Sequence, residues 1–355
     1  MPTLDIAHRR LHNQHLSSTA FKKPADLVNW MGAVQAQDYY GAKWALAQRM
    51  KDATDETIEK AFANGDILRT HVMRPTWHFV TPADIRWLLK LTGPRVNAAC
   101  SHNYRKFELD AAVFKRSNKA LASALRNGRQ LTRETLRKAV ERAGIAADHL
   151  IRFIHLLIRA ELDGVICSGA RKGKQFTYAL LDERAPQSKT LTRDEALAEL
   201  ARRYFTSHGP ATLQDFTWWS GLTVADARSG LDLVQRQLSK EVIDAKTYWL
   251  PSSAPVIKPA SRAVFLLPIY DEYLVAYKDR SAALNSKQAM PGNVVFSSAI
   301  VIDGCVEGSW KRTFKNNSVI ITLSPFAPFK KAAKLAVHNA AHRYATFLGL
   351  KAEFT

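Results

Sequence analysis

The chain has 355 residues and carries 51 lysines and arginines against 32 aspartates and glutamates, a formal net charge of +19. Its 46% hydrophobic content excludes an intrinsically disordered chain, and 16 glycines and 14 prolines are too few for a collagen-like or low-complexity one. The cysteines Cys100, Cys167 and Cys305 are isolated, so neither a disulfide framework nor a metal site is indicated, and no cofactor is expected.

The length corresponds to two or three domains at about 150 residues each. No apolar run approaches the roughly 18 residues that a membrane-spanning helix needs. The N-terminal segment also lacks the continuous apolar stretch of a secretory signal. We therefore expect a soluble, cytoplasmic protein with no membrane partner.

The first segment, residues 1–110, predicts helices followed by two short strands. Pro24 suits the first turn of a helix, and a second helix is expected around Asp55–Ala63. Two runs rich in β-branched and aromatic residues follow, Ile67–Val72 and Thr76–Val80. Helices closed by a two-stranded ribbon describe a winged helix-turn-helix unit.

The same order recurs in residues 111–185 and 186–255. The expected helices are Leu121–Leu125, Arg133–Ala143 and His149–Leu162 in the former, and one from Asp194 to about Thr206, Leu213–Trp219 and Val224–Leu238 in the latter. The expected strands are 164–168 with 175–180, and a β stretch near 242–250. Thr132, Thr212 and Thr223 are expected to cap helices. We therefore predict three winged-helix units in tandem.

Beyond a linker rich in proline and serine at 251–259, the pattern changes to strands. The β-rich runs are 263–267, 294–302, 305–310 and 318–323, with Asp303-Gly304 as a hairpin turn, and a closing helix spans 328–348 and packs partly through Leu335. Residues 256–355 thus predict a β-rich, barrel-like domain. The fold class expected for the whole chain is mainly α with β, an α+β protein.

Positive charge is concentrated in two stretches. Residues 111–184 carry a net +8 and residues 256–355 a net +7, whereas residues 1–110 carry +4 and residues 185–255 none. A polyanionic partner is favoured, and nucleic acid is the expected one, with association to the nucleoid. A generically basic protein without such a partner is the alternative.

The tip of the second hairpin is the first candidate for contact with nucleic acid. Arg171, Lys172 and Lys174 lie there with flanking glycines, followed by Gln175. Long cations at this place can reach phosphates, and the glycines let the backbone come close. A solvated turn is the alternative.

The first hairpin carries further candidates. Arg69 and Arg74 lie on or beside it, and each can bind a phosphate or form a surface ion pair. Trp77 and His78 are candidates for a pocket. No second cluster of ligands lies near His71 and His78 in the sequence, so a metal site is not expected there. A Gly-rich phosphate loop and the HExxH and GxSxG motifs are also absent.

The segment Gln35-Ala36-Gln37 lies where the helical periodicity ends, after Gly32. Two residues apart, the glutamine side chains point about 200° away from each other on a helix but to the same side in an extended segment. There, close to Tyr39, an amide pair can position a water or a base edge. Alternatively, the glutamines cap carbonyls at a helix C-terminus.

Asp271 and Glu272 are adjacent carboxylates that follow a buried-looking strand. Because adjacent residues of a strand face opposite sides, at most one of them is expected to look into a shared cleft. Asp271 and His12 complete the set of pocket candidates.

Seven segments, in order over about 300 residues, carry a resemblance to a known family. They are IAHRRLHNQHL, GAVQAQDYYGAKWALAQR, LRTHVMRPTWHFVTPAD, GVICSGARKGKQFTYAL, RYFTSHGPATLQDFTWWSGL, LLPIYDEYLVAYKDR and IVIDGCVEGSWKR. The chain resembles the winged-helix DNA glycosylases of the AlkZ/YcaQ superfamily, within its AlkZ-like branch. This resemblance implies tandem winged helices around a basic channel, and a monofunctional DNA glycosylase for bulky or crosslinking N-alkylated purines. The Gln-x-Gln motif of that branch falls on Gln35 and Gln37, which are therefore the catalytic residues that the resemblance implies.

The implied chemistry is coherent. An N7- or N3-alkylated purine is positively charged, so it can leave without a general acid, through an oxocarbenium-like state. Gln37 would orient a water beneath C1′ while Gln35 braces the water or the sugar. Because a glutamine pair does not readily deprotonate water, neutral damaged bases are expected to be poor substrates.

Other classes of protein compete with this hypothesis. The main alternative is a non-catalytic winged-helix DNA-binding protein or transcriptional regulator, which would prefer a palindromic site and dimerise. No dimerisation element is evident, so a monomer is expected. An RNA-binding protein fits less well because no RNA-module pattern is present.

Overall fold

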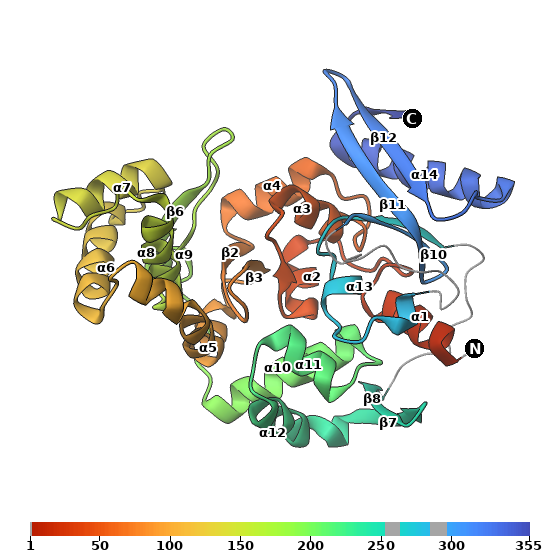
Figure 1. Ribbon diagram of the computed structural model, residues 1–355, viewed down its shortest axis with the longest axis horizontal. Coiled ribbons are helices and arrows are strands. Elements are labelled where there is room, and N and C mark those ends of the chain that lie inside the picture. Colours follow the sequence, from red (N-terminus) through yellow and green to blue (C-terminus); the bar gives the residue numbers. More distant parts are fainter. Residues whose placement is uncertain (1, 253–262, 285–296) are drawn as a thin grey trace. The chain divides into compact units, whose positions relative to one another are not determined.

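The structure is a computed structural model that describes residues 2–252, 263–284 and 297–355 (Figure 1). Contacts divide the chain into two compact units. Unit 1 comprises Met1–Glu59, Ala198–Trp219 and Val224–Thr355, and unit 2 comprises Lys60–Leu197 and Ser220–Thr223. Both units combine helices with strands, so the α+β fold class is confirmed. Within the described ranges, no helix has the length and apolar character needed to cross a membrane.

The helical part of unit 1 comes from the start and the middle of the chain. Its helices are α1 (Pro2–Asn13), α2 (Pro24–Met31), α3 (Tyr39–Ala47), the start of α4 (Asp55–Asn64), most of α10 (Arg193–His208) and α11 (Leu213–Ser220), and α12 (Val224–Val234). The prediction that Thr212 caps α11 is confirmed. Its Oγ1 accepts a hydrogen bond from the Asp215 N–H at 3.1 Å, and Asp215 Oδ2 accepts one from the Thr212 N–H at 3.0 Å. This reciprocal capping box satisfies two backbone donors at the start of the helix.

Helix α3 was not predicted, and its burial explains why. Residues 41–47 are all buried, so no polar face alternates with an apolar one to give an amphipathic period. The segment around Asp38, which the sequence indicated as the fraying end of a helix, lies at the start of α3 instead.

The helix predicted for Val224–Leu238 is one turn shorter in the structure. A 3₁₀ turn (Gln235–Gln237) follows α12, and Leu238 opens β7 (Leu238–Ile243), which pairs antiparallel with β8 (Lys246–Pro251). Pro251, predicted to begin a linker, is the last residue of β8 and stands opposite Leu238. Residues 253–259 of that predicted linker lie outside the described residues.

The C-terminal part of unit 1 is a five-stranded sheet in the order β13-β12-β11-β10-β9. The strands are β9 (Val264–Leu267), β10 (Ala299–Ile302), β11 (Cys305–Phe314), β12 (Ser318–Pro325) and β13 (Lys351–Phe354). The predicted Asp303-Gly304 hairpin is confirmed, because both residues have positive φ, 48° and 86°, between the paired ends of β10 and β11. Residues 294–296 of the predicted run 294–302 lie outside the described residues.

Helix α14 (Lys331–Leu348) contacts this sheet and ends at Gly349, which has φ of +67°. The N–H of Leu350 bonds to the carbonyl of Ala345 at 2.9 Å, which closes the helix and turns the chain into β13. Its buried face is formed by Val337, Ala340, Ala341, Tyr344, Ala345 and Phe347. The prediction that Leu335 packs inward is wrong, because its side chain is 65% exposed.

Unit 2 contains two strand hairpins and a group of packed helices. Its helices are α5 (Ile85–Lys106), α6 (Ala111–Leu125), α7 (Arg133–Arg142), α8 (Leu150–Leu162) and the short α9 (Leu181–Arg184). Helix α8 packs against α5 and α6. The predicted Thr132 cap of α7 is confirmed by the bond that Thr132 Oγ1 accepts from the Thr135 N–H at 3.4 Å.

The hairpins of unit 2 lie where the sequence indicated them. Strand β2 (Leu68–His71) pairs with β3 (Trp77–Val80), and β5 (Ile166–Ser168) pairs with β6 (Thr177–Leu180). A third short strand, β4 (Leu131–Thr132), adds to β6 on its other side. The three predicted helix-and-hairpin groups are thus present as elements, while the division of the chain into four domains at 110, 185 and 255 stays a prediction.

Candidate active site

Gln35 and Gln37 lie between α2 and α3, outside both helices, with Gln35 on a short strand and Gln37 at a bend. The helix ends at Met31, and Gly32 follows with φ of +81°, a backbone conformation that favours glycine. Gln35 is then the second residue of the short strand β1 (Val34–Gln35). Neither glutamine therefore belongs to the last turn of α2.

The two glutamines differ in exposure. Gln35 is only 7% exposed, whereas Gln37 is exposed, and Ala36 between them is fully buried. Gln37 is thus the member of the pair that a molecule from solution can reach directly. Gln35 is fixed within the packed part of unit 1.

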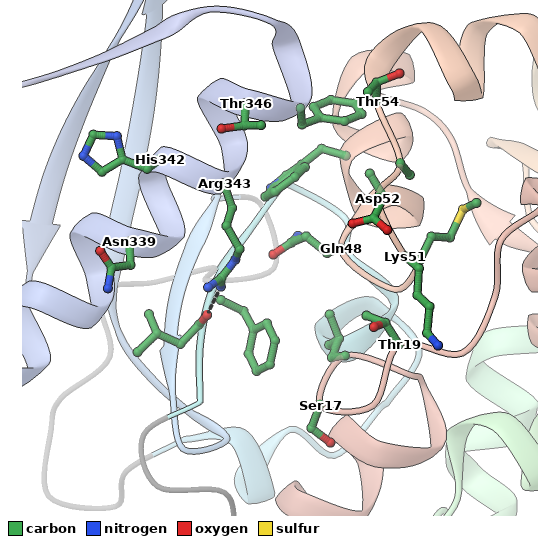
Figure 2. Close-up of a pocket in the computed structure, with 18 of the residues that line it drawn as sticks. Ser17, Thr19, Gln48, Lys51, Asp52, Thr54, Asn339, His342, Arg343 and Thr346 are labelled. Carbon is green, nitrogen blue, oxygen red and sulfur yellow. Dashed lines mark hydrogen bonds between the residues drawn. The ribbon is translucent and has the colours of Figure 1, made fainter.

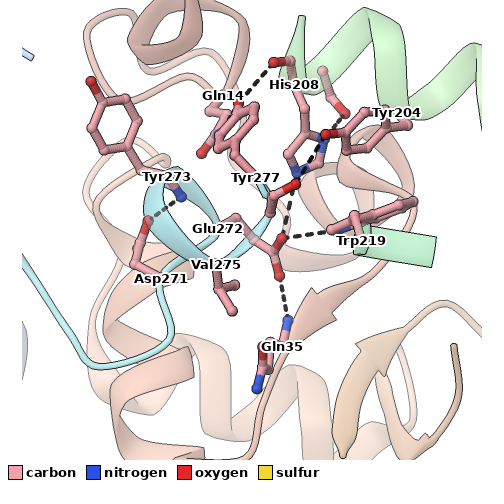
Figure 3. A network of polar contacts seen from close by, with 12 residues as sticks. Gln14, Gln35, Tyr204, His208, Trp219, Asp271, Glu272, Tyr273, Val275 and Tyr277 are labelled. Carbon is pink, nitrogen blue, oxygen red and sulfur yellow. Dashed lines mark hydrogen bonds and ion pairs between the residues drawn. The ribbon is translucent and has the colours of Figure 1, made fainter. Parts of the chain in front are cut away.

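A buried carboxylate contacts the backbone of this segment (Figure 3). The N–H of Gln35 donates a hydrogen bond to Glu272 Oε1 at 2.7 Å, and the indole N–H of Trp219 donates to Oε2 at 3.0 Å. The Nε2 atom of His208 lies 3.5 Å from the same Oε2. Glu272 is 1% exposed and His208 is fully buried. Burial lowers the pKa of His208 although Glu272 opposes this shift, so the ring is neutral at pH 7.

The polar network continues away from the glutamines. The hydroxyl of Tyr277 donates to the backbone carbonyl of His208 at 2.7 Å and accepts from Gln14 Nε2 at 2.8 Å. The Oε1 atom of Gln14 in turn accepts from Arg49 Nη2 at 2.8 Å. The guanidinium of Arg49 also binds both oxygens of Asp271, at 2.7 and 2.9 Å. These contacts link the residues just after α1 and α3 with the end of α10 and with the residues that flank α13 (Glu272–Val275), all within unit 1.

Asp271 and Glu272 do not lie on a strand, so the expectation that they face opposite sides of one is wrong. Tyr270 has φ of +64° and turns the chain, after which Asp271 caps α13 by accepting the Tyr273 N–H at 2.9 Å. Both carboxylates are buried. Asp271, a predicted pocket residue, is bound by Arg49, whereas Glu272 reaches the glutamine segment.

The other pocket candidates of unit 1 lie at different places. The hydroxyl of Tyr39 donates to Glu59 at 3.1 Å, and its side chain is 3% exposed. His12 lies near the end of α1 and is half-buried.

In unit 2, Arg69 is held between aromatic rings. Its guanidinium carbon lies 4.2 Å from the ring centre of Trp77 and 4.8 Å from that of Phe176, and its side chain is buried. His78 is fully buried, with Nδ1 3.0 Å from the carbonyl of Thr76. Arg74, in the turn between β2 and β3, is half-buried. The fold therefore brings Arg69 and Trp77 together, with Arg69 buried and Trp77 half-buried.

The tip of the β5–β6 hairpin has the shape that the sequence indicated. Lys172 and Gln175 exchange two backbone hydrogen bonds, at 2.9 and 3.1 Å, and Gly173 turns between them with φ of +60°. Lys172, Lys174 and Gln175 are exposed. Arg171 is half-buried, with its guanidinium 5.6 Å from the ring centre of Phe176. We name residues 171–175 the basic wing.

A hollow of about 850 Å³ in unit 1 lies between α14 and the loop that follows α3 (Figure 2). Gln48, Lys51, Asp52, His342 and Arg343 line it, and both amide atoms of Gln48 are buried without a hydrogen-bond partner among the described residues. No predicted site residue lines this hollow.

In unit 2, a smaller hollow of about 440 Å³ is lined by Lys174 and Gln175 of the basic wing, together with Arg133 and Arg137 of α7. Two of the predicted contacts with nucleic acid therefore lie beside further cations of the same unit.

Sequence reasoning missed Trp219 and His208, and it did not connect Glu272 with the glutamines. Glu272 and Gln35 are separated by 237 positions, and no local pattern signals a contact over that distance. The only local signal was a pair of adjacent carboxylates after a buried-looking strand, and this signal does not distinguish Asp271 from Glu272.

Comparisons with known proteins agree with this architecture. A family model described as DNA glycosylase AlkZ-like matches residues 28–347. An interstrand DNA cross-link repair glycosylase of Streptomyces sahachiroi is 23% identical over 354 residues, which cover 93% of this chain and 94% of that protein. The solved structure of S. sahachiroi DNA glycosylase AlkZ superposes with a TM-score of 0.78 at 20% identity, over 99% of both chains, and so has the same fold. The predicted enzyme class is confirmed over the alternative of a non-catalytic DNA-binding protein: the chain belongs to the AlkZ-like DNA glycosylases.

Proposed function

We propose that this enzyme hydrolyses the N-glycosidic bond of cationic N7- or N3-alkylated purines in double-stranded DNA, acting as a monomer. Bulky adducts and interstrand crosslinks belong to the proposed substrates, which the name of the S. sahachiroi relative supports. The observation that carries the proposal is the glutamine segment between α2 and α3, with Gln37 exposed and the backbone of Gln35 bonded to Glu272.

Gln37 is the residue that meets the reacting atoms in this mechanism. Its amide oxygen accepts a hydrogen bond from a water and holds that water beneath C1′ of the damaged nucleotide. Gln35 braces the same water or the sugar. The positive charge on the alkylated purine already makes it a good leaving group, so departure needs no proton from the enzyme. The glutamines therefore contribute position rather than basicity.

Phosphate contacts are assigned to unit 2. Lys172, Lys174 and Gln175 are exposed at the tip of the basic wing, where their side chains extend into solvent. Arg171 and Arg74 are half-buried, and Arg69 is buried against Trp77. We assign the main electrostatic contribution to the wing lysines and a supporting role to the three arginines.

The test is a single-turnover assay on a duplex with one N7-methylguanine. Gln37→Ala is expected to lower the rate about 10²–10³-fold, the order of the loss when one preorganised hydrogen-bonding group is removed from an enzyme active site, with duplex binding retained. Gln235→Ala is the matched control, because that glutamine is exposed in the 3₁₀ turn before β7. Undiminished activity in the Gln35→Ala/Gln37→Ala double variant would refute the assignment.

Substrate class is tested separately. The same duplex is prepared with a neutral lesion such as hypoxanthine and with a nitrogen-mustard crosslink between two guanines. Release of N7-methylguanine and unhooking of the crosslink, with hypoxanthine left in place, is expected. Efficient release of hypoxanthine would show that the leaving group needs no positive charge, contrary to the proposal.

A further inference from the structure

Glu272 presents both oxygens of a buried carboxylate to groups around the glutamine segment. One oxygen accepts the Gln35 N–H at 2.7 Å, and the other accepts the Trp219 indole N–H at 3.0 Å with His208 Nε2 at 3.5 Å (Figure 3). At 2.7 Å the hydrogen bond from the Gln35 N–H is short, and it ties the backbone of the catalytic segment to this buried carboxyl group. We call this bond the tether.

Burial of Glu272 and Trp219 holds the carboxyl group in place beside the glutamine segment. The carboxylate is 1% exposed, at the first residue of α13, and Trp219 is fully buried. The same indole lies 3.5 Å from the point where a Cβ on Gly32 would stand, so Trp219 contacts the turn that leads into the segment as well as the carboxylate. Gly32 is thus packed against Trp219, and Gln35 is bonded to Glu272, which itself is bonded to Trp219.

We propose that Glu272 is a positioning residue for catalysis, and that the hydrogen bonds its two oxygens accept set the place of Gln35 and Gln37. This inference rests on the proposed function of the two glutamines. Gln37 has only two peptide units between itself and the tethered N–H, so displacement of that N–H moves the amide that holds the water. Misplacement of a reacting group by about 1 Å costs on the order of 10²-fold in rate.

An amide of the same shape cannot accept both of these N–H hydrogen bonds. A glutamine has the same shape but offers an acceptor at one end and an NH₂ donor at the other. In Glu272→Gln the NH₂ group would face either the Gln35 N–H or the Trp219 N–H, and one of these bonds is lost in either orientation. The variant therefore tests the tether without creating a cavity.

The experiment compares Glu272→Gln with Glu353→Gln, a matched control whose carboxylate is exposed on β13 and pairs with Lys315. Three quantities are measured: the single-turnover rate on N7-methylguanine duplex, the affinity for the same duplex, and deuterium uptake of the peptide that contains Gln35. Glu272→Gln is expected to lower the rate about 10–100-fold, to leave the affinity unchanged, and to speed exchange at the peptide. Glu353→Gln is expected to match the parent in all three.

A second variant, Trp219→Phe, keeps a large aromatic ring and the Gln35 bond but removes the indole N–H. Trp219→Phe is also expected to lower the single-turnover rate, but by less than Glu272→Gln does. If Glu272→Gln does not fold, a parent-like rate in Trp219→Phe overturns the inference, and a lowered rate at parent-like affinity supports it.

Failures of the two proposals are distinguishable. If the Gln35/Gln37 double variant stays active, both fall. If that double variant is inactive while Glu272→Gln keeps the parent rate and the parent exchange, only the role of Glu272 is refuted. A loss of rate and affinity in equal measure, with faster exchange throughout unit 1, marks a structural role and overturns the positioning role as well.

Discussion

The ion pair between Arg49 and Asp271 lies in the interior of unit 1. If one partner is neutralised, the other is left as a buried charge without a counter-charge. Each residue is 2% exposed, and the guanidinium meets the carboxylate through two hydrogen bonds, at 2.7 and 2.9 Å. Arg49 has two further acceptors, the carbonyl of Ala45 and Oε1 of Gln14, but neither carries a negative charge. In Asp271→Asn the guanidinium therefore stays buried and charged without an anion beside it.

The expected cost of Asp271→Asn is about 3–5 kcal/mol, the range for breaking a buried ion pair by removing one partner. Because about 1 kcal/mol lowers the melting temperature of a domain of 150–250 residues by roughly 2–4 °C, the transition of unit 1 should fall by about 6–20 °C. The partly exposed pair Lys246–Asp279, at 2.5 Å, supplies the control, and Asp279→Asn should cost only about 0–1 kcal/mol.

Thermal melting followed by circular dichroism measures both variants, and a third variant tests the cause. Arg49→Met added to Asp271→Asn removes the stranded charge and should recover part of the lost stability. Equal shifts for Asp271→Asn and Asp279→Asn would refute the reasoning. So would a double variant that is less stable than Asp271→Asn, because the cost would then come from lost packing rather than from an unpaired charge.

Three other predictions concern charge, pH and helix capping. Lys172→Ala should weaken duplex binding on every sequence and flatten the salt dependence of binding by about one unit, and an unchanged slope in filter binding would exclude a phosphate contact. Burial lowers the pKa of His208 below 6.5 in the folded protein, so the unfolded state binds the proton first as the pH falls. The free energy of unfolding should therefore decrease below pH 6.5, by at most about 1.4 kcal/mol per pH unit. Urea unfolding at pH 8 and pH 5 should show this loss reduced in His208→Gln, and an identical loss in both proteins would contradict it. Asp110 caps α6 by accepting the Val113 N–H at 2.7 Å. Asp110→Ala should therefore lower the free energy of unfolding in urea by about 1 kcal/mol, and Asp110→Asn, which keeps an acceptor oxygen, should lower it less. Equal losses in the two variants would argue against the cap.

Local signals accounted for much of the fold. Thr132 and Thr212 were recognisable as caps because a side-chain oxygen before an apolar period satisfies donors within the next turn. The turn at Asp303-Gly304 was recognisable because its backbone conformation requires residues that tolerate positive φ. In each case the deciding interaction lies within four residues of the signal.

Other elements were decided by contacts between distant residues. Strand β13 pairs in parallel with β12 across the whole of α14, and nothing in its four residues announces that partner. The candidate site shows the same division. The glutamines were identified by resemblance to a family, whereas the groups that hold them, Glu272 and Trp219, come from parts of the chain more than 180 residues away and are joined to them only by folding.

The tether on the glutamine segment begins at a main-chain N–H, and this has a consequence for how the enzyme can be altered. Every amino acid except proline supplies that N–H, so exchanging the side chain at position 35 leaves the anchor to Glu272 in place. Substitutions at position 35 can therefore change the side chain while the main-chain anchor stays in place, within the space that this 7% exposed position allows. Proline has no N–H and would remove the anchor itself.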